Sequence, residues 1–202
     1  LIFLLNLKWF GAPGNRTPHF FIYKIITMDK LNHIFQELVN QGKYPGIQWK
    51  IIHKKRNYEG KVGYKNLDTK ENIQDDTLYR IWSMTKPIVA IAAMQLVEKD
   101  LVQLDDPINS YLPEFTDLKV LKNEKEIITN TIHLEKQPTI KDLLLHTAGF
   151  SYNFLEDPIG KEYDKIKLFN SSTTSLEEEI KLLAKLPLLY QPSSKWRYSV
   201  SM

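Results

Sequence analysis

The chain has 202 residues, of which 43% are hydrophobic, and a net charge of +3, so it is long enough for a domain with its own core. It contains no cysteine, which excludes disulfides, thiol catalysis and cysteine-based zinc sites. Its 27 basic residues are interspersed with 24 acidic ones, and this composition argues against a nucleic-acid partner. The histidines are dispersed and no metal or nucleotide motif occurs, so we expect no metal and no cofactor.

Residues 1–27 lack the pattern of a folded element. The apolar run from Leu1 to Leu5 is too short for a signal peptide, and nothing reaches the roughly 18–20 apolar residues of a membrane span. We expect Met28 to be the initiator and residues 1–27 to be an extension outside a domain formed by residues 28–202. A truncated export signal is the alternative. Without a visible signal peptide the sequence favours the cytoplasm, with the periplasm or secretion as the alternative.

The first part of this domain alternates between helix and strand patterns. Residues 29–42 carry the i, i+3, i+4, i+7 apolar stripe of an amphipathic helix, with Gly42 as its stop. Residues 46–54 alternate between apolar and polar side chains, and residues 58–64 are a plausible return strand. A third short strand is expected over residues 77–82. Helix, hairpin and strand together indicate an α+β beginning.

A long apolar helix is predicted next. From Ile88 to Val97 only Gln95 is polar, and a helix that is apolar all round is a buried one. Pro87 suits the first turn, where a backbone N–H is dispensable. Ser83 and Lys86 therefore lie on the opening turn of a central buried helix, three residues apart and on one face.

Ser83 and Lys86 suggest chemistry at that helix start. A serine that caps a helix usually has Glu or Gln three residues on, whereas Lys86 opposes the positive end of the helix. That field and burial should lower the pKa of Lys86 below its usual value of about 10.4. A neutral amine could then take the proton of the Ser83 hydroxyl, and backbone N–H groups would face the oxyanion formed by attack on a carbonyl. The alternative is an ordinary cap beside a surface lysine.

The second half of the chain contains several shorter elements. Residues 106–113 should form a short helix capped by an aspartate that precedes a proline. Residues 119–121 and 127–134 could form strands. Two capping boxes predict helices, one beginning at Thr139 and ending at Gly149, the other running over residues 175–186.

Four blocks of the sequence resemble the serine β-lactamase superfamily, and most closely class C β-lactamases with the related carboxylesterases and D-amino-acid peptidases. The blocks run from Tyr79 to Pro87, from Leu101 to Phe115, from Thr139 to Phe150 and from Pro192 to Val200. They occur in the family's order and cover most of the chain after residue 30. The resemblance implies an α+β fold, in which an antiparallel sheet flanked by helices faces a helical lobe across the active site.

The same resemblance implies roles for individual residues. Ser83 matches the nucleophile of the family's S-x-x-K motif and Lys86 its activating neighbour. Tyr198 matches the tyrosine that moves the proton to the leaving group, which a phenol near an ammonium can do because its pKa is lowered. A buried structural tyrosine is the alternative for Tyr198. Trp82 either lines the substrate pocket or packs against the fold, and His146 suits the negative end of a helix rather than catalysis.

Two departures from the family pattern limit these expectations. Val200 stands two residues after Tyr198, where β-lactamases carry an asparagine that holds the substrate amide, so this substrate-binding position favours an esterase-like member. The family's third motif, Lys or His followed by x-Gly on a late strand, is not found in the four residues after Tyr198. We therefore expect an N-terminal fragment truncated before the C-terminal strands, and this puts the activity of the fragment in doubt.

These observations together predict a monomeric serine hydrolase that acts through an acyl-enzyme. Its substrates would be small esters or amides, as for a carboxylesterase, a β-lactamase or a D-amino-acid peptidase, and it would have no membrane span. The alternative is a catalytically inactive fragment, or a penicillin-binding-like domain that serves in binding or scaffolding.

Overall fold

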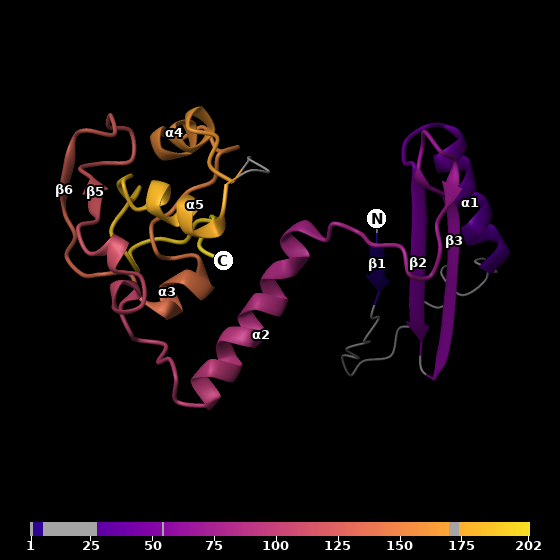
Figure 1. Cartoon of the computed structure of the whole chain (residues 1–202), viewed down its shortest axis with the longest axis horizontal. Coiled ribbons are helices and arrows are strands. Elements are labelled where there is room, and N and C mark those ends of the chain that lie inside the picture. The colour runs from indigo at the N-terminus through magenta and orange to yellow at the C-terminus, as the bar shows by residue number, and fades with distance from the viewer. Residues whose placement is uncertain (1, 6–27, 54, 170–173) are drawn as a thin grey trace, which may run out of the picture. The chain divides into compact units, whose positions relative to one another are not determined.

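The computed structural model describes residues 2–5, 28–53, 55–169 and 174–202. These residues form two compact units, Leu1–Arg80 and Ile81–Met202 (Figure 1). Most of the predicted extension, residues 1–27, lies outside the described residues, and its assignment stays a prediction. Among the helices that are described, none has the length and apolar character needed to cross a lipid bilayer.

The first unit contains a four-stranded sheet in the order β1-β2-β3-β4. Its strands are β1 (Ile2–Leu5), β2 (Gly46–His53), β3 (Arg56–Asn66) and β4 (Glu71–Asn72). The predicted hairpin is confirmed, because all of β2 pairs antiparallel with the first eight residues of β3, whereas β1 runs parallel to β2. The prediction of a third strand over residues 77–82 is wrong, because these residues form no strand. Gln74 N–H donates to Thr77 Oγ1 at 2.8 Å and Thr77 N–H donates back to Gln74 O at 3.3 Å, so the backbone turns here instead of entering the ladder.

The predicted first helix is also confirmed, as α1 (Met28–Asn40), and it packs against this sheet (Figure 1). Trp49 on β2 is only 2% exposed; its Nε1–H donates to Asn32 Oδ1 at 3.0 Å and its ring lies 6.3 Å from that of Phe35. On β3, Gly60 lies opposite Trp49, and a Cβ at that position would approach the indole ring to 2.7 Å. Glycine is therefore required there, because a real Cβ would clash with the ring.

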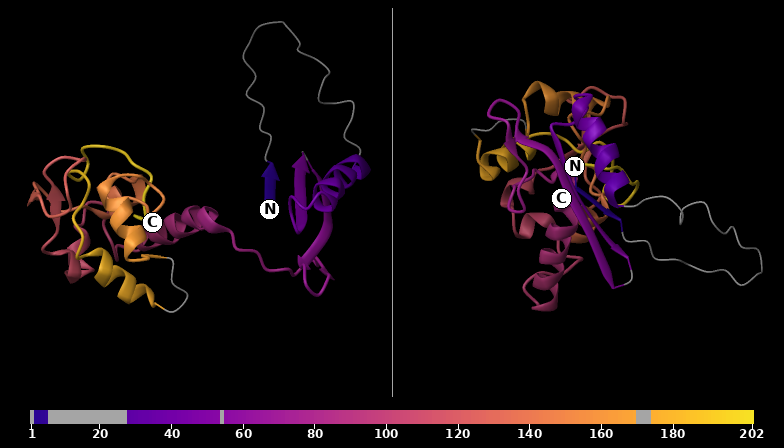
Figure 2. Two further views of the ribbon diagram at one scale, coloured as in Figure 1. Left: turned by 90° about the horizontal axis from the view of Figure 1, so that it is seen from above. Right: turned by 90° about the vertical axis from the view of Figure 1, so that its right-hand side faces the viewer.

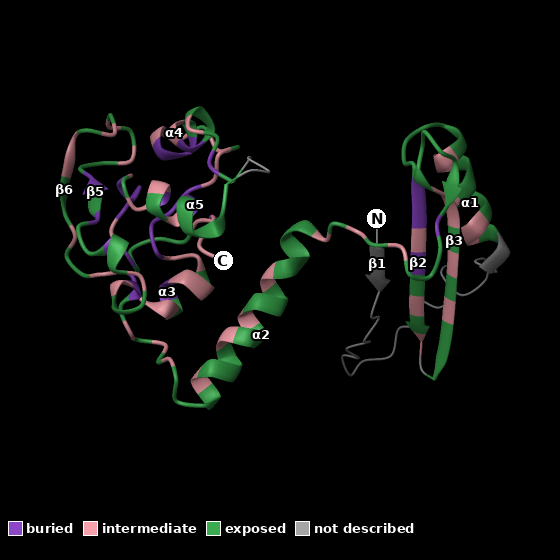
Figure 3. Cartoon of the chain, viewed as in Figure 1, coloured by how far each residue is buried: buried purple, intermediate pink, exposed green. Residues whose placement is uncertain are grey.

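The second unit begins with a 3-10 turn, Trp82–Met84, that continues into α2 (Thr85–Glu98). The helix itself was predicted correctly, but its predicted burial is wrong. No residue of α2 is buried, Ile88 and Ile91 are 59% and 63% exposed, and most of the helix has the colour of exposed residues in Figure 3. An apolar helix gains free energy from burial only where another surface covers it, and the other described elements of this unit leave α2 uncovered.

The remaining elements of the second unit form a small lobe beside α2 (Figures 1 and 2). They are the 3-10 turns Ile108–Ser110 and Pro113–Phe115, β5 (Lys119–Leu121), β6 (Thr131–His133), α3 (Ile140–Leu145), α4 (Pro158–Lys165) and α5 (Leu176–Leu183). The strand predicted over residues 119–121 is confirmed as β5, and the one predicted over residues 127–134 is present only as the shorter β6, with which β5 pairs antiparallel. The helix predicted over residues 106–113 is reduced to a 3-10 turn, because the Asp106 carboxylate accepts from Gln103 N–H and the Tyr111 hydroxyl instead of capping a helix.

A single hydrophobic core holds this lobe together. Its fully buried members come from the 3-10 turns, β5, α4, α5 and the connecting segments, and include Ile108, Phe115, Val120, Phe150, Ile159, Tyr163, Leu168, Leu183, Leu188 and Leu189. Both predicted capping boxes are present, Thr139 with Asp142 on α3 and Ser175 with Glu178 on α5. Helix α3 ends three residues earlier than predicted, at His146, whose φ of +58° is left-handed.

The carboxylate of Asp142 connects the start of α3 to two other segments. It accepts hydrogen bonds from Thr139, from Thr147 Oγ1 at 2.7 Å and from Ser193 Oγ at 2.6 Å, and it is 4% exposed. Burial alone raises its pKa, but the hydrogen bonds from Ser193, Thr147 and Thr139 outweigh burial and lower the pKa below the ordinary aspartate value. The charged form is therefore stabilised in the folded protein.

Replacing Asp142 with Asn should lower the free energy of unfolding by about 1.5–3 kcal/mol, since hydrogen bonds to a charged acceptor are lost. The folded pKa is depressed, so this stabilisation is complete above the unfolded value of about 3.9 and is lost as pH falls through the folded pKa. Urea unfolding followed as a function of pH measures both effects. Asp105→Asn, at an exposed position, is the control; equal losses in the two variants would contradict this account.

Candidate active site

Ser83 lies in the 3-10 turn that precedes α2, and Lys86 lies in the first turn of that helix. Their spacing of three residues puts Lys86 Nζ 3.5 Å from Ser83 Oγ. The residue before Ser83, Trp82, has a φ of +48°, a left-handed conformation that costs a bulky residue on the order of 1–2 kcal/mol. Such local strain is often found at functional sites, and here it sets the direction in which the chain enters the Ser83 turn.

Two tyrosines from distant parts of the second unit complete the cluster. The hydroxyl of Tyr198 is hydrogen-bonded to Ser83 Oγ at 2.6 Å, and Lys86 Nζ donates to the hydroxyl of Tyr152 at 3.1 Å. The two phenol rings stack with their centroids 5.4 Å apart. The lysine ammonium lies 4.9 Å from the ring centroid of Tyr198 and 5.4 Å from that of Tyr152. The structure thus brings together the three residues that the sequence nominated as catalytic.

Tyr152 was missed by sequence reasoning. It lies only two residues after Phe150, where one of the four resembling blocks ends, so its position offered a signal. No local pattern distinguishes it from the other nine tyrosines of the chain, and its approach to Lys86 is a contact across 66 residues.

The charges of the cluster differ from those expected from the sequence. Burial lowers the pKa of Lys86, but the hydrogen bonds to Tyr198 and Tyr152 act in the opposite direction and leave this pKa raised. The prediction of a lowered lysine pKa is therefore wrong, because the two phenol oxygens that stabilise the ammonium could not be seen from the helix alone. The hydrogen bonds with Ser83 and with Lys86 lower the pKa of Tyr198. Tyr198, rather than Lys86, is therefore the group of this cluster whose deprotonated form is stabilised.

His146 holds the Tyr198 segment from one side. Its backbone oxygen accepts from Arg197 N–H at 3.0 Å and its Nδ1 lies 3.3 Å from Ser199 N, whose N–H it accepts. Burial first, and then the charge of Lys86, lower the pKa of His146, which favours the neutral imidazole. The residues on both sides of Tyr198 are therefore bonded to His146, which fits a positioning role.

Asp157 joins the segments of the two tyrosines. Its Oδ2 accepts from Arg197 Nη2 at 2.8 Å and from Ser151 Oγ at 2.6 Å, while its Oδ1 caps α4. Since Ser151 precedes Tyr152 and Arg197 precedes Tyr198, one largely buried carboxylate fixes the spacing of the stacked phenols.

The two predicted substrate-binding residues lie in different places. Trp82 is 78% exposed and lines a shallow pocket of about 250 Å³ together with Ser83, Lys86 and Tyr152. Val200 does not line that pocket; its side chain packs against the core of the lobe and borders a larger apolar cavity. Across the described ranges, His, Asp and Glu form no group of three or more that could hold a metal ion.

The comparisons with known proteins bear on this geometry. A family model described as "Beta-lactamase" matches residues 31–201 of the chain. The chain belongs to the beta-lactamase family.

Relatives of this beta-lactamase-family chain include proteins named for ester chemistry. It is 36% identical over 139 residues to Protein Rv1367c of Mycobacterium tuberculosis, covering 68% of the chain and 34% of the relative. It is 29% identical over 177 residues to Esterase EstB of Burkholderia gladioli, covering 86% of the chain and 42% of EstB. Among solved structures, "EstCE1, a hydrolase with promiscuous acyltransferase activity" superposes with a TM-score of 0.67 at 26% identity, covering 86% of the chain and 44% of EstCE1. The α+β fold expected from the sequence is confirmed, and the chain spans less than half the length of these relatives.

One prediction from the site geometry concerns the ionisation of Tyr198. The difference in phenolate absorbance between the native chain and Tyr198→Phe should titrate below the ordinary tyrosine value of about 10, because Ser83 and Lys86 stabilise the phenolate. Lys86→Met should move that midpoint upward, whereas Lys99→Met, at the exposed end of α2, should leave it in place. A midpoint that does not respond to Lys86→Met would contradict the proposed pairing.

The second prediction concerns Asp157. Asp157→Asn removes the charged partner of Arg197, so the Tyr198 segment should loosen and the midpoint of Tyr198 should rise as its bonds to Ser83 and Lys86 lengthen. Absorbance titration at a temperature where the variant is folded measures this shift. Asp164→Asn, on the exposed side of α4, is the control. A variant that is merely less stable, with an unchanged Tyr198 midpoint, would show that Asp157 has no positioning role.

Proposed function

We propose that this chain carries the nucleophile and proton-transfer groups of a serine hydrolase that acts through an acyl-enzyme on small esters. The observation that carries the proposal is the 2.6 Å contact between the hydroxyls of Tyr198 and Ser83, with the Lys86 ammonium beside both. A serine needs an adjacent base to become a nucleophile, and a phenol whose pKa is lowered beside an ammonium is suited to that role.

The reaction begins when Ser83 Oγ attacks the ester carbonyl and its proton passes to the Tyr198 phenolate. The negative charge on the carbonyl oxygen would face the backbone N–H of Ser83, in the turn that leads into α2, as in an oxyanion hole. The C–O bond to the leaving alcohol then breaks, and Tyr198 returns the proton to that alcohol. Water then attacks the carbonyl of the acyl-enzyme and gives a proton to Tyr198. The bond to Ser83 Oγ breaks, Tyr198 returns the proton to Ser83, and the acid is released. Lys86 remains an ammonium throughout.

An ester is favoured over a β-lactam or a peptide because of Val200. A valine side chain cannot donate the hydrogen bond that an asparagine two residues after the tyrosine would give to a substrate amide. Relatives named as an esterase and as a hydrolase with acyltransferase activity support the same preference. A transfer of the acyl group to an alcohol instead of water would use the same acyl-enzyme.

The proposal extends to the organisation of the chain. Residues 28–202 would form the β-lactamase-related part, which is supported by the family match to residues 31–201. Residues 1–27 would be an extension of it, whose strand β1 pairs with β2. The enzyme would act as a monomer without nucleic acid, and the small net charge of +3 supports the latter. Because the chain spans 34–42% of the length of the two curated relatives, the activity and substrates of a whole protein are part of this proposal.

Covalent labelling of Ser83 tests the function directly. The folded chain, incubated with p-nitrophenyl butyrate or a fluorophosphonate, should gain one adduct by intact-mass spectrometry, and peptide mapping should place it on Ser83. Ser83→Ala should abolish the adduct, whereas Ser110→Ala, at an exposed serine of the lobe, should not. Tyr198→Phe should slow labelling by about 10²–10⁴-fold, the usual contribution of a general base.

Two outcomes would contradict this function. The first is a folded chain that takes up no adduct, which would favour an inactive or purely binding member of the family. The second is an adduct that persists in Ser83→Ala, since the reactive group would then lie elsewhere.

A further inference from the structure

We infer that the apolar cavity of the second unit binds the acyl chain of the ester substrate, an inference that rests on the function proposed above. The cavity has a volume of about 440 Å³, within the roughly 300–1,000 Å³ range of small-molecule sites. Ser83 would hold the acyl carbon at the neighbouring pocket while the apolar chain extends into this cavity. The substrate class would then be esters of medium-length aliphatic or aromatic acids.

The walls of the cavity are apolar and largely fixed. Phe115, Phe150 and Leu183 are 3%, 2% and 6% exposed, and they belong to the hydrophobic core of the lobe. Leu143 on α3 and Ile180 on α5 add further apolar surface. Packed core side chains resist displacement, so the cavity has a defined shape, and its only polar side chains are hydroxyls.

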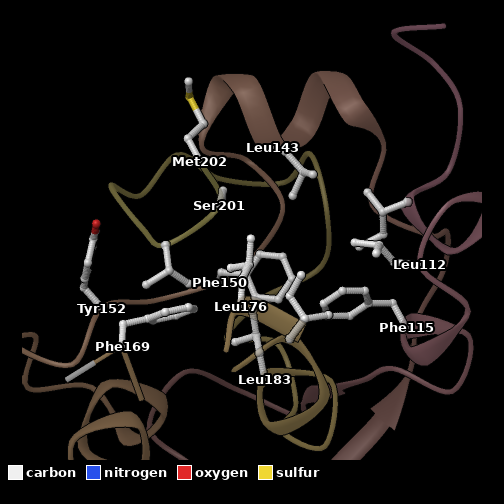
Figure 4. A pocket seen from close by; sticks show the side chains of 13 residues that line it. Leu112, Phe115, Leu143, Phe150, Tyr152, Phe169, Leu176, Leu183, Ser201 and Met202 are labelled. Carbon is white, nitrogen blue, oxygen red and sulfur yellow. The ribbon is translucent and has the colours of Figure 1, made fainter. Parts of the chain in front are cut away.

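Tyr152 connects the cavity to the nucleophile. Both Tyr152 and Met202 line the apolar cavity and also the shallow pocket that contains Ser83 and Lys86. Figure 4 shows Tyr152 at one end of the cavity and Phe115 at the other. Because the Tyr152 hydroxyl accepts from Lys86 at 3.1 Å, the end of the cavity at Tyr152 lies next to the reacting groups.

The acyl side of the ester fits this cavity better than the alcohol side does. The leaving alcohol receives its proton from Tyr198, and Tyr198 lines neither the cavity nor the shallow pocket. The acyl group stays on Ser83 after the alcohol departs, and it extends past Tyr152. A charged acyl group would be excluded, since no lining residue carries a charge that could compensate its desolvation.

A series of p-nitrophenyl esters from acetate to octanoate tests the assignment on the full chain. The acylation rate constant at Ser83, divided by the ester's dissociation constant, should rise about threefold to fourfold with each methylene that enters the cavity. A matched series that keeps the acetyl group and lengthens the alkyl alcohol should show a much smaller rise. A flat response to acyl length, or a rise with alcohol length alone, would overturn the inference.

Variants on one helix locate the effect. Leu143→Trp places a larger side chain in the cavity and should remove the preference for octanoate over acetate. Leu145→Trp, on the same helix but 53% exposed and not a lining residue, should keep the preference. If Leu143→Trp fails to fold, Leu176→Glu at the 70% exposed rim serves instead, because a carboxylate there should disfavour long acyl chains only. An unchanged preference in the folded rim or wall variant would overturn the inference.

Binding without catalysis separates this inference from the proposed function. Calorimetry with sodium octanoate and the Ser83→Ala chain should show binding that Leu143→Trp or Leu176→Glu weakens, and butyrate should bind more weakly than octanoate. Suppose that octanoate binds, that the cavity variants weaken its binding, and that the native chain is nevertheless never labelled at Ser83. The cavity assignment then stands, and the proposed hydrolase function is contradicted. If Ser83 labels but octanoate does not bind, the function stands and the cavity assignment fails.

Discussion

The hydrogen bond between Tyr198 and Ser83 is the interaction on which the candidate site depends. It joins residues 115 positions apart, and it is possible only because the Tyr198 segment is itself held by His146 and Asp157. Without these anchors the phenol would have to order a free segment of chain, whose entropy cost exceeds the net gain of one hydrogen bond. The polar contacts behind the tyrosines are therefore as necessary as the tyrosines themselves.

The charge distribution of the site follows from the same arrangement. A lysine at a helix start, considered alone, should lose its proton more easily, and this is the expectation that the tertiary contacts reverse. Two phenol oxygens near Lys86 favour the ammonium, and the ammonium in turn favours the phenolate of Tyr198. The ammonium of Lys86 and the phenolate of Tyr198 therefore stabilise each other, and in the proposed reaction the phenolate, not a neutral lysine, would accept the Ser83 proton.

The exposed helix α2 shows where composition alone misleads. Its apolar residues predicted burial, because apolar surface favours removal from water, and that prediction is wrong for the described structure. An apolar helix is buried only if another apolar surface packs against it. The apolar side chains of the lobe pack instead into its own core around Phe115, Phe150 and Leu188. The same lobe leaves a cavity that opens beside Tyr152, so its packing provides both the support of the site and space for a substrate.

The sequence by itself determined the local elements and the identity of the nominated residues. The stripe of α1, the hairpin, the two capping boxes and the Ser83–Lys86 spacing all depend on neighbours within a few positions, and each is present in the structure. Only the tertiary structure decided the approach of Tyr152 and Tyr198 to Lys86, the raised pKa of that lysine and the separation of Val200 from the pocket of Trp82. These features are contacts between segments far apart in the chain, and no local pattern encodes the distances or the dielectric environment that such contacts create.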